Sequence, residues 1–333
     1  MTATLRDVAR LAGVSFKTVS NVVNGHPSVA PATRTRVLQA IEEAGYRPNR
    51  SARRLRSGRS GVIALAVPAL SHAYFAELAD DVITAARRHG LDVVVHQTGG
   101  DAERERRVLD EARDGVTDGL LFSPLGLREE DAAEFDPALP LVLLGERILG
   151  GGPDHVTMEN VAGARAMTSA LLDRGRRRIA VLGARPQEST GTAGLRLTGY
   201  RAALAEHGVG SSDELIVPTG GWTRSHGAEA ARRVLDAGAD AIFAITDELA
   251  LGALRALADA GVDVPGDVAV AGFDDIEEAR FSTPRLSTVD AGRARIADLA
   301  VETLVERIGS DEPREGRLIT TPFAVVERES TGA

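Results

Sequence analysis

Residues 4–24 have the sequence TLRDVARLAGVSFKTVSNVVN, which predicts two short helices joined by a tight turn. Thr4 can cap the first helix, and Asp7, three residues later, can complete a capping box. Gly13 can end this helix because glycine tolerates the positive φ of a turn. Ser15 can cap the second helix. This pattern is typical of the helix-turn-helix motif, whose second helix enters the major groove of DNA.

The two faces of the second predicted helix differ in chemistry. Val19, Val22 and Val23 recur at helical spacing and form the apolar face. The opposite face carries mostly hydroxyls, amides and one cation, which are groups that contact base edges and phosphates. The residues predicted on this face are Phe16, Lys17, Thr18, Ser20, Asn21 and Asn24. The second helix is therefore predicted to contact DNA.

A third helix is predicted to complete this small domain. Pro31 is a start signal, since proline is favoured in the first helical turn, and Gly45 is a stop signal. The apolar residues predicted between them are Val37, Leu38 and Ile41. These side chains would give the first two helices a surface to pack against.

Residues 46–58 have the sequence YRPNRSARRLRSG, which is strongly basic. Pro48 can begin a short helix, and Leu55 is the one large aliphatic side chain among its charges. Leu55 can be an ordinary linker residue, or it can be a wedge that enters between base steps and kinks the duplex. Its position alone leaves both interpretations open.

The charges of the chain are distributed unevenly. Residues 1–60 contain 11 basic and 3 acidic residues, a net charge of +8, whereas the other 273 residues contain 28 basic and 45 acidic ones. A basic segment on an acidic body indicates a nucleic-acid binder. A solvated basic tail is the alternative, and the helical periodicity of the segment argues against it.

From Gly61 onward, apolar strand-like runs alternate with amphipathic helical ones. The predicted strands are Val62–Val67, Leu91–His96, Leu120–Phe122, Leu141–Leu144, Ile179–Leu182, Leu215–Val217, Ala241–Ile245 and Val268–Ala271. The predicted helices include Ala73–Arg88, Glu103–Arg113, Val161–Arg174, Arg196–Glu206, Ser225–Ala237 and Glu248–Ala260. This alternation predicts parallel sheets in two α/β subdomains, with a ligand cleft outside the carboxyl ends of their strands.

The sequence offers little for catalysis or for a cofactor. Lys17 is the only lysine and there is no cysteine, so a phosphate-binding G-x-x-x-x-G-K loop, a Schiff-base lysine in the core and a thiolate metal site are excluded. The seven histidines have no metal-ligand spacing. A secretion signal and a membrane span are not found, so we expect a cytoplasmic, nucleoid-associated protein rather than a secreted binding protein.

Long motifs resemble the lactose/purine repressor family (LacI/GalR-type regulators). They are D-V-A-R-L-A-G-V-S-x-x-T-V-S-N-V-V-N-G and A-I-E-E-A-G-Y-R-P-N near the N-terminus, then R-L-x-G-Y-R-A-A-L, V-x-V-x-G-F-D-D and E-R-E-S-T. The resemblance implies an all-α helix-turn-helix DNA-binding domain and an α/β periplasmic-binding-protein-like core of two doubly wound subdomains. The domains expected are 1–47 (helix-turn-helix), 48–60 (hinge helix and linker) and 61–333 (effector-binding and dimerisation core), whose subdomains are approximately 61–160 with 290–318 and 161–289 with 319–333.

The resemblance also implies which residues contact DNA. The expected base-contacting residues are Phe16, Lys17 and Asn21. The residues expected on the DNA backbone are Ser15, Thr18, Ser20, Asn24, Thr33 and Tyr46, and Thr4 is counted with this DNA-binding set. The expected hinge contacts are Asn49, Ala52, Arg53 and Leu55, with Leu55 of each protomer inserted into the minor groove. Many relatives have Arg where Asn21 stands, so the operator half-site stays open.

For the effector, the resemblance implies a set of pocket residues. Arg196 and Asp274 are the expected polar anchors, and they suit a sugar because a guanidinium donates to two oxygens and a carboxylate accepts from two hydroxyls. Trp222, the only Trp, can stack on a sugar ring or a base, and Phe75 is expected on the opposite wall. The remaining expected pocket residues are Arg147 and Thr246. They stand where the chain departs from the family, with Gly145-Glu146-Arg147 and Thr246-Asp247 in place of the usual Asp-Arg and Asn-Asp.

From the residues alone, structural roles are also possible. Arg196 can form a salt bridge between subdomains, Asp274 can cap a turn and Trp222 can belong to the core. With the resemblance, we expect a homodimeric repressor on a pseudo-palindromic double-stranded operator, controlled by a small effector without metal or cofactor. The effector expected first is a sugar, and next a nucleobase or another polar metabolite.

Overall fold

The computed structural model describes residues 3–23, 26, 28–46, 59–148, 152–188, 190–310 and 315–332. The chain divides into two compact units, Met1–Ser60 and Gly61–Ala333, and each unit is described by itself. Residues 47–58, which include most of the predicted hinge, lie outside the described residues, as does Asn24.

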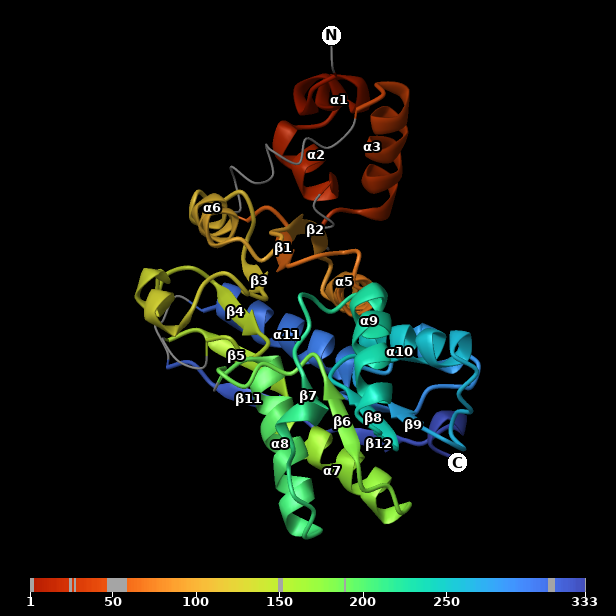
Figure 1. Ribbon diagram of the computed structural model, residues 1–333. Coiled ribbons are helices and arrows are strands. Elements are labelled where there is room, and N and C mark those ends of the chain that lie inside the picture. Colours follow the sequence, from red (N-terminus) through yellow and green to blue (C-terminus); the bar gives the residue numbers. More distant parts are fainter. Residues whose placement is uncertain are drawn as a thin grey trace. The chain divides into compact units, whose positions relative to one another are not determined.

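The first unit has three helices in its described part: α1 (Leu5–Ala12), α2 (Phe16–Val23) and α3 (Pro31–Glu43) (Figure 1). The predicted capping box is confirmed. The Thr4 N–H donates to Asp7 Oδ2 at 3.0 Å, and the Asp7 N–H donates to Thr4 Oγ1 at 3.3 Å. Gly13 ends α1 with a φ of 62°. The Thr18 N–H donates to Ser15 Oγ at 3.1 Å, so the predicted cap of α2 is also confirmed.

Small aliphatic side chains form the core of the first unit. They are Val8, Ala9, Ala12, Val19, Val22, Val37 and Ala40. The prediction that Leu38 belongs to the apolar side of α3 is wrong, because this side chain is 52% exposed. Successive residues of an α-helix are turned by about 100°, so Ala40 and Ile41 share the side of Val37 and Leu38 does not.

The second unit contains a six-stranded parallel sheet in the order β11-β5-β4-β3-β1-β2. Its strands are β1 (Val62–Val67), β2 (Asp92–Gln97), β3 (Leu120–Phe122), β4 (Leu141–Leu144), β5 (Asp154–Met158) and β11 (Leu318–Thr321). The helices packed on it are α5 (Ala73–Arg88), α6 (Ala102–Arg113) and α11 (Arg293–Ile308). Ile63 and Leu65 of β1 pack with α5 and α11, whereas Ala64 and Ala66 pack with α6. Helices therefore cover both faces, as a parallel sheet requires.

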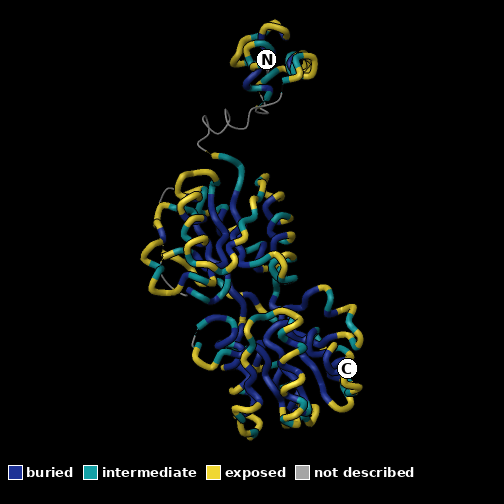
Figure 2. The backbone as a smooth tube through the Cα atoms, turned by 45° about the horizontal axis from the view of Figure 1, so that its top comes forward, coloured by how far each residue is buried: buried dark blue, intermediate teal, exposed yellow. Residues whose placement is uncertain are grey.

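A second parallel sheet has the order β7-β6-β8-β9. Its strands are β6 (Ile179–Leu182), β7 (Ile216–Val217), β8 (Ala241–Ala244) and β9 (Ala269–Ala271). Two packed helix pairs accompany it: α7 (Asn160–Asp173) with α8 (Thr192–Glu206), and α9 (Arg224–Asp236) with α10 (Asp247–Asp259). Gly252 allows the close approach of α9 and α10, since a Cβ there would lie 1.9 Å from the Arg224 carbonyl oxygen. In residues 61–333, each of the two sheets and the helices packed on it form one layer. Buried segments run through the middle of each layer (Figure 2).

The chain passes between the two layers three times, after β5, after β10 (Thr288–Asp290) and after β11. β10 pairs antiparallel with β12 (Ala324–Val326) in a small separate sheet. The remaining elements are short 3-10 helices, η1 (Glu129–Glu134), η2 (Asp213–Leu215), η3 (Glu277–Arg280) and η4 (Glu329–Thr331). The predicted division placed residues 319–333 with the second subdomain. β11 corrects this, because it pairs with β5 of the first sheet as far as Thr321.

The sequence did not predict β5, since three of its five residues are polar. Asp154 in this strand is fully buried and accepts hydrogen bonds from Arg307 at 2.7 Å and Arg317 at 3.1 Å. Burial raises its pKa, but these guanidiniums outweigh burial and hold the pKa of Asp154 far below its ordinary value. Tertiary partners from the C-terminal part of the chain thus make a polar strand stable inside the protein.

The predicted fold class is confirmed: a helical unit precedes an α/β unit with two parallel sheets. Within the described ranges, no helix combines the length and apolar character needed to cross a bilayer.

Candidate functional site

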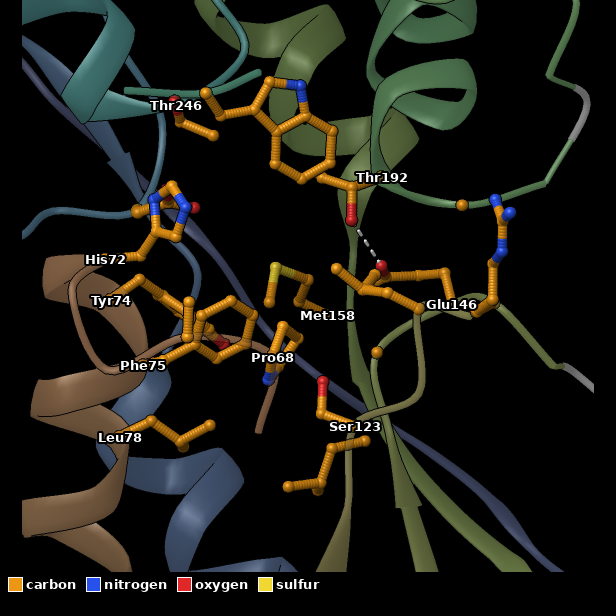
Figure 3. A pocket seen from close by; sticks show the side chains of 18 of the residues that line it. Pro68, His72, Tyr74, Phe75, Leu78, Ser123, Glu146, Met158, Thr192 and Thr246 are labelled. Carbon is orange, nitrogen blue, oxygen red and sulfur yellow. Dashed lines mark hydrogen bonds between the residues drawn. The ribbon is translucent and has the colours of Figure 1, made fainter. Parts of the chain in front are cut away.

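A cavity of about 300 Å³ lies at the carboxyl ends of strands from both sheets (Figure 3). Residues at or just beyond strand ends line it, among them Pro68 after β1, Ser123 after β3 and Asp274 three residues beyond the end of β9. This is the position at which open α/β sheets bind ligands. All six predicted pocket residues line this cavity: Phe75, Arg147, Arg196, Trp222, Thr246 and Asp274.

The first turns of α5 form one wall of the cavity. His72, Tyr74, Phe75 and Leu78 come from this segment, and Figure 3 shows them across the cavity from Glu146 and Thr192. The rings of Tyr74 and Phe75 meet edge to face with their centroids 5.4 Å apart. Such a wall can cover the apolar face of a ring-shaped ligand.

Arg196 and Asp274 form a buried pair at the floor of the cavity. Arg196 is 2% exposed, and its Nη1 donates to Asp274 Oδ1 at 3.1 Å. Its Nε donates to Asn160 Oδ1 at 2.8 Å, and its guanidinium carbon lies 3.5 Å from the centroid of the Phe273 ring. Among the described residues, Nη2 has only the weakly accepting sulfur of Met158, at 3.3 Å. A ligand oxygen would be a better acceptor for Nη2.

The backbone and the electrostatics of Asp274 are both unusual. Its φ is 120°, which side chains rarely adopt, and its N–H donates to the Val289 carbonyl at 2.9 Å, which helps to hold this geometry. Burial raises the pKa of Asp274 to about 6, because it outweighs the attraction of Arg196. Oδ2 of Asp274 accepts no hydrogen bond from the described residues. A strained, buried carboxylate with a free acceptor is typical of a binding site.

Asp247 holds the segment around Asp274 in place, and the neighbouring Thr246 caps α10. Oγ1 of Thr246 accepts from the Leu249 N–H at 3.4 Å and caps α10, so this hydroxyl is already used within the protein. Asp247 is fully buried and accepts from Thr288 Oγ1 at 2.5 Å and from the Ile276 N–H at 3.0 Å. Burial raises the pKa of Asp247 well above its ordinary value, and the neighbouring Asp274 adds to this.

Sequence reasoning did not select Glu146 or Tyr74 as pocket residues. Glu146, 5% exposed, accepts from Thr157 Oγ1 at 3.0 Å and from Thr192 Oγ1 at 2.8 Å (Figure 3). Burial and the nearby carboxylates of Asp274 and Glu146 raise the pKa of Tyr74, so its hydroxyl stays protonated. Glu146 is the second residue beyond the end of β4, and this position near a strand's carboxyl end was the signal that could have found it.

The outer part of the cavity contains Arg147, Arg185, Glu188 and Trp222, which we call the outer cluster. Arg185 Nη1 donates to Glu188 Oε1 at 3.0 Å, and its guanidinium carbon lies 5.5 Å from the centroid of the Trp222 ring. Arg147 Nη1 lies 3.6 Å from the same Glu188 oxygen. The buried Nε of Arg147 and Nε1 of Trp222 have no hydrogen-bond partner among the residues that the structure describes.

In the first unit, α2 presents part of its predicted DNA-contacting face. Phe16 is 47% exposed, Lys17 is exposed, and Thr18 and Asn21 are half-buried. The outward placement of Ser20 is wrong, because this residue is 9% exposed. It is turned by only about 60° from Val23 around the helix, so it borders the apolar side.

The other predicted DNA-contacting residues have local roles or lie outside the described residues. Thr4 belongs to the capping box and Ser15 caps α2, and both are exposed. Thr33 and Tyr46 are half-buried, and Tyr46 packs against the core of the unit. The predicted DNA contacts outside the described residues are Asn24, Asn49, Ala52, Arg53 and Leu55. No group of three or more His, Cys, Asp or Glu suited to a metal ion occurs in the described ranges.

Known proteins resemble this chain over nearly its whole length. Residues 4–49 match the description "Bacterial regulatory proteins, lacI family", and residues 168–331 match "Periplasmic binding protein-like domain". The ribose operon repressor of Escherichia coli K12 is 34% identical over 332 residues, which are 98% of this chain and 99% of that protein.

Two solved structures illustrate the likeness. A LacI-family transcriptional regulator from Sanguibacter keddieii DSM 10542 is 53% identical, with a TM-score of 0.77, over 83% of this chain and 100% of that one. The Lac repressor dimer bound to operator and the anti-inducer ONPF is 27% identical, with a TM-score of 0.86, over 100% of both chains.

A helix-turn-helix unit and a periplasmic-binding-protein-like unit with a cavity at its strand ends together define a class of DNA-binding transcription regulators. The chain belongs to the LacI family of bacterial regulatory proteins. Its relatives include repressors, and the family consists of transcription regulators rather than enzymes.

Proposed function

We propose that the protein is a homodimeric repressor that binds a pseudo-palindromic operator and is controlled by a small polar effector in the cavity. The observation that carries the effector part is the Arg196–Asp274 pair, which lines the cavity. Among the described residues, Arg196 Nη2 has a weak acceptor and Asp274 Oδ2 accepts no hydrogen bond. Together they suit adjacent hydroxyls, one accepting and one donating, so a sugar is the effector expected first. The ribose operon repressor and the ONPF-bound Lac repressor support this choice as relatives.

The DNA-binding part of the proposal rests on the exposed side of α2. Phe16, Lys17 and Asn21 are proposed to contact bases, and the hinge of residues 48–60 is proposed to fold on DNA with Leu55 in the minor groove. A dimer fits because a two-fold axis matches a palindromic operator, and the Lac repressor is bound to its operator as a dimer. The proposed domains are 1–47, 48–60 and 61–333. Within 61–333, the chain is proposed to pass from the first subdomain to the second after residue 321.

Contacts across the cavity suggest how an effector controls DNA binding. The Ala73 N–H at the start of α5 donates to Glu248 Oε1 of α10 at 3.1 Å. The Glu277 N–H of η3 donates to Glu77 Oε1 of α5 at 2.9 Å. Each bond joins an element of the first layer to one of the second. A ligand between the layers would change the population of this arrangement, and with it the spacing of the two hinges in a dimer.

Operator release by the effector tests this function. A DNA sequence selected from a random pool by the full chain is used in a fluorescence-anisotropy titration, with and without candidate sugars and nucleobases. We expect two-fold symmetric selected sequences and a change of affinity with at least one compound. Selection of sequences without two-fold symmetry would contradict the dimer, and an affinity that no compound changes would contradict effector control.

A further inference from the structure

The outer cluster contains two guanidiniums and a single carboxylate. Arg147 follows β4, Arg185 lies just beyond β6, and Glu188 is within hydrogen-bond distance of Arg185 but not of Arg147. With all three side chains ionised, the cluster has a net charge of +1. This positive charge lies at a cavity that a ligand is proposed to enter.

Arg147 is poorly satisfied for a guanidinium in this position. It donates no hydrogen bond to any of the described residues, its Nε is buried, and its side chain is only 21% exposed. A guanidinium offers five N–H donors in a planar fork that fits carboxylate and phosphate oxygens. Leaving such donors without an acceptor is unfavourable, so the geometry calls for an oxygen-rich group beside Arg147.

Trp222 supplies a second unsatisfied donor in the same cluster. Its buried Nε1 has no acceptor among the described residues, and its ring is already in contact with the Arg185 guanidinium. Both buried unsatisfied groups that line the cavity are donors. The group that completes this region must therefore accept hydrogen bonds, and beside a net positive charge it is favoured to be an anion.

The floor of the cavity has the opposite character. There the carboxylates of Asp274 and Glu146 accept hydrogen bonds, which suits the hydroxyls of a ligand. A ligand with hydroxyls at one end and an anionic group at the other would satisfy both regions. A neutral sugar would leave Arg147 and Arg185 to share the single carboxylate of Glu188.

We propose that the effector carries a phosphate or carboxylate group that binds Arg147 and Trp222 in the outer cluster, and that Glu188 is its intramolecular competitor. This inference rests on the proposed function, since it assigns the chemical class of the effector in the same cavity. It identifies sugar phosphates and sugar acids, rather than neutral sugars, as the compounds recognised. The incoming anion takes the place of Glu188 beside the two guanidiniums.

Matched pairs of probes test the inference on the full chain by thermal shift and isothermal calorimetry. The pairs are glucose and glucose 6-phosphate, ribose and ribose 5-phosphate, and galactose and galacturonate. We expect the charged member of at least one pair to bind about 10-fold or more tightly than its neutral partner, because charge-assisted hydrogen bonds are added. Inorganic phosphate serves as a probe that does not depend on the sugar.

Three variants test which side chains affect binding of the charged group. Arg147→Gln is expected to lower the affinity for the charged ligand about 10-fold or more and to abolish the thermal shift that inorganic phosphate causes. Arg255→Gln removes the same charge from an exposed site on α10 and is expected to leave both unchanged. Glu188→Gln is expected to raise the affinity for the charged ligand several-fold, because the competing carboxylate is gone.

The outcomes separate the two proposals. If neutral sugars bind as tightly as their charged partners, or if Arg147→Gln weakens both alike, the anionic group is refuted and the effector cavity is retained. Equal phosphate shifts in the wild type, Arg147→Gln and Arg255→Gln also refute the anionic group. If no compound binds, or if a compound releases the operator equally well from the wild type and from Asp274→Asn, the proposed effector site itself is wrong.

Discussion

Replacement of Asp274 by Asn is expected to make the protein more stable and less responsive at the same time. Asn keeps an oxygen that can accept from Arg196, so the hydrogen bond now made at 3.1 Å can persist. It removes the ionisable group, which is buried beside Asp247 and Glu146. The variant thus changes the charge of the cavity floor with little change in its shape.

The size of the effect follows from the pKa of Asp274, which burial raises from 3.8 to about 6. The folded protein holds this proton more tightly than the unfolded chain, so the stabilisation is complete below pH 3.8 and is lost as the pH rises through 6. At about 1.4 kcal/mol for each pH unit between these values, the ionised carboxylate costs about 3 kcal/mol above pH 7. At pH 4.5 the same linkage leaves a cost of about 1 kcal/mol.

Urea unfolding followed by the fluorescence of Trp222 measures this difference. Trp222 is the only Trp and belongs to the unit Gly61–Ala333, so the signal reports that unit alone. We expect Asp274→Asn to raise the free energy of unfolding by about 3 kcal/mol at pH 7.5 and by about 1 kcal/mol at pH 4.5. Protein concentration is held constant, because a dimer's stability depends on it. Asp236→Asn, on the exposed end of α9, is the control for loss of one charge.

The functional part of this prediction is loss of effector release with operator affinity retained. The amide nitrogen of Asn donates where Oδ2 of the carboxylate would accept from a ligand hydroxyl. The reasoning is refuted if Asp274→Asn is less stable than the wild type at pH 7.5, or if the gain does not shrink at pH 4.5. A variant that loses operator binding while remaining folded would show that Asp274 is not a sensor of the effector.

Three further predictions concern the hinge, the division of the chain and the cavity wall. Leu55→Ala is expected to weaken binding to the selected operator but to leave salt-sensitive binding to random DNA intact. An equal loss of affinity for both DNAs in anisotropy titrations would contradict the wedge role. Residues 61–333 alone are expected to fold, as measured by circular dichroism, and to bind the effector, as measured by calorimetry. An unfolded product, or a folded one that does not bind, would contradict the proposed division. Glu105 accepts from the N–H groups of Leu125, Gly126 and Leu127 at 2.8–3.1 Å, so Glu105→Gln is expected to cost about 2–3 kcal/mol in urea unfolding. The exposed control Glu103→Gln is expected to cost nothing measurable, and equal losses would count against this role.

The local signals of the sequence were reliable where one residue type is required by the backbone. The capping box of Thr4 and Asp7, the positive φ of Gly13 and the cap at Ser15 all follow from bonds within three or four residues. The errors at Leu38 and Ser20 arose at the edge of an apolar helix face. Periodicity leaves such positions open, and packing against the neighbouring helices decides them.

Some pocket residues could be predicted from the sequence, whereas others depend on contacts between residues distant in the chain. All six predicted residues line the cavity, and the family resemblance had selected them. Glu146 was missed although its position just beyond β4 was a local signal. Tyr74 was not predicted, since the raised pKa of its hydroxyl comes from burial and from charges distant in sequence, such as Asp274. The same is true of β5, whose buried Asp154 depends on Arg307 and Arg317.

By itself, the sequence determined that this chain has a helix-turn-helix unit followed by an α/β unit with parallel sheets. Capping, periodicity and the alternation of strands and helices are short-range properties, and each can be recognised in a few consecutive residues. Only the tertiary structure decided which polar groups are already satisfied. Arg196 is largely paired inside the protein, whereas Arg147 and Trp222 keep buried donors without acceptors in the described part of the chain. The physical reason is that the satisfaction of a buried donor depends on atoms brought together by the fold, often from residues far apart in the chain.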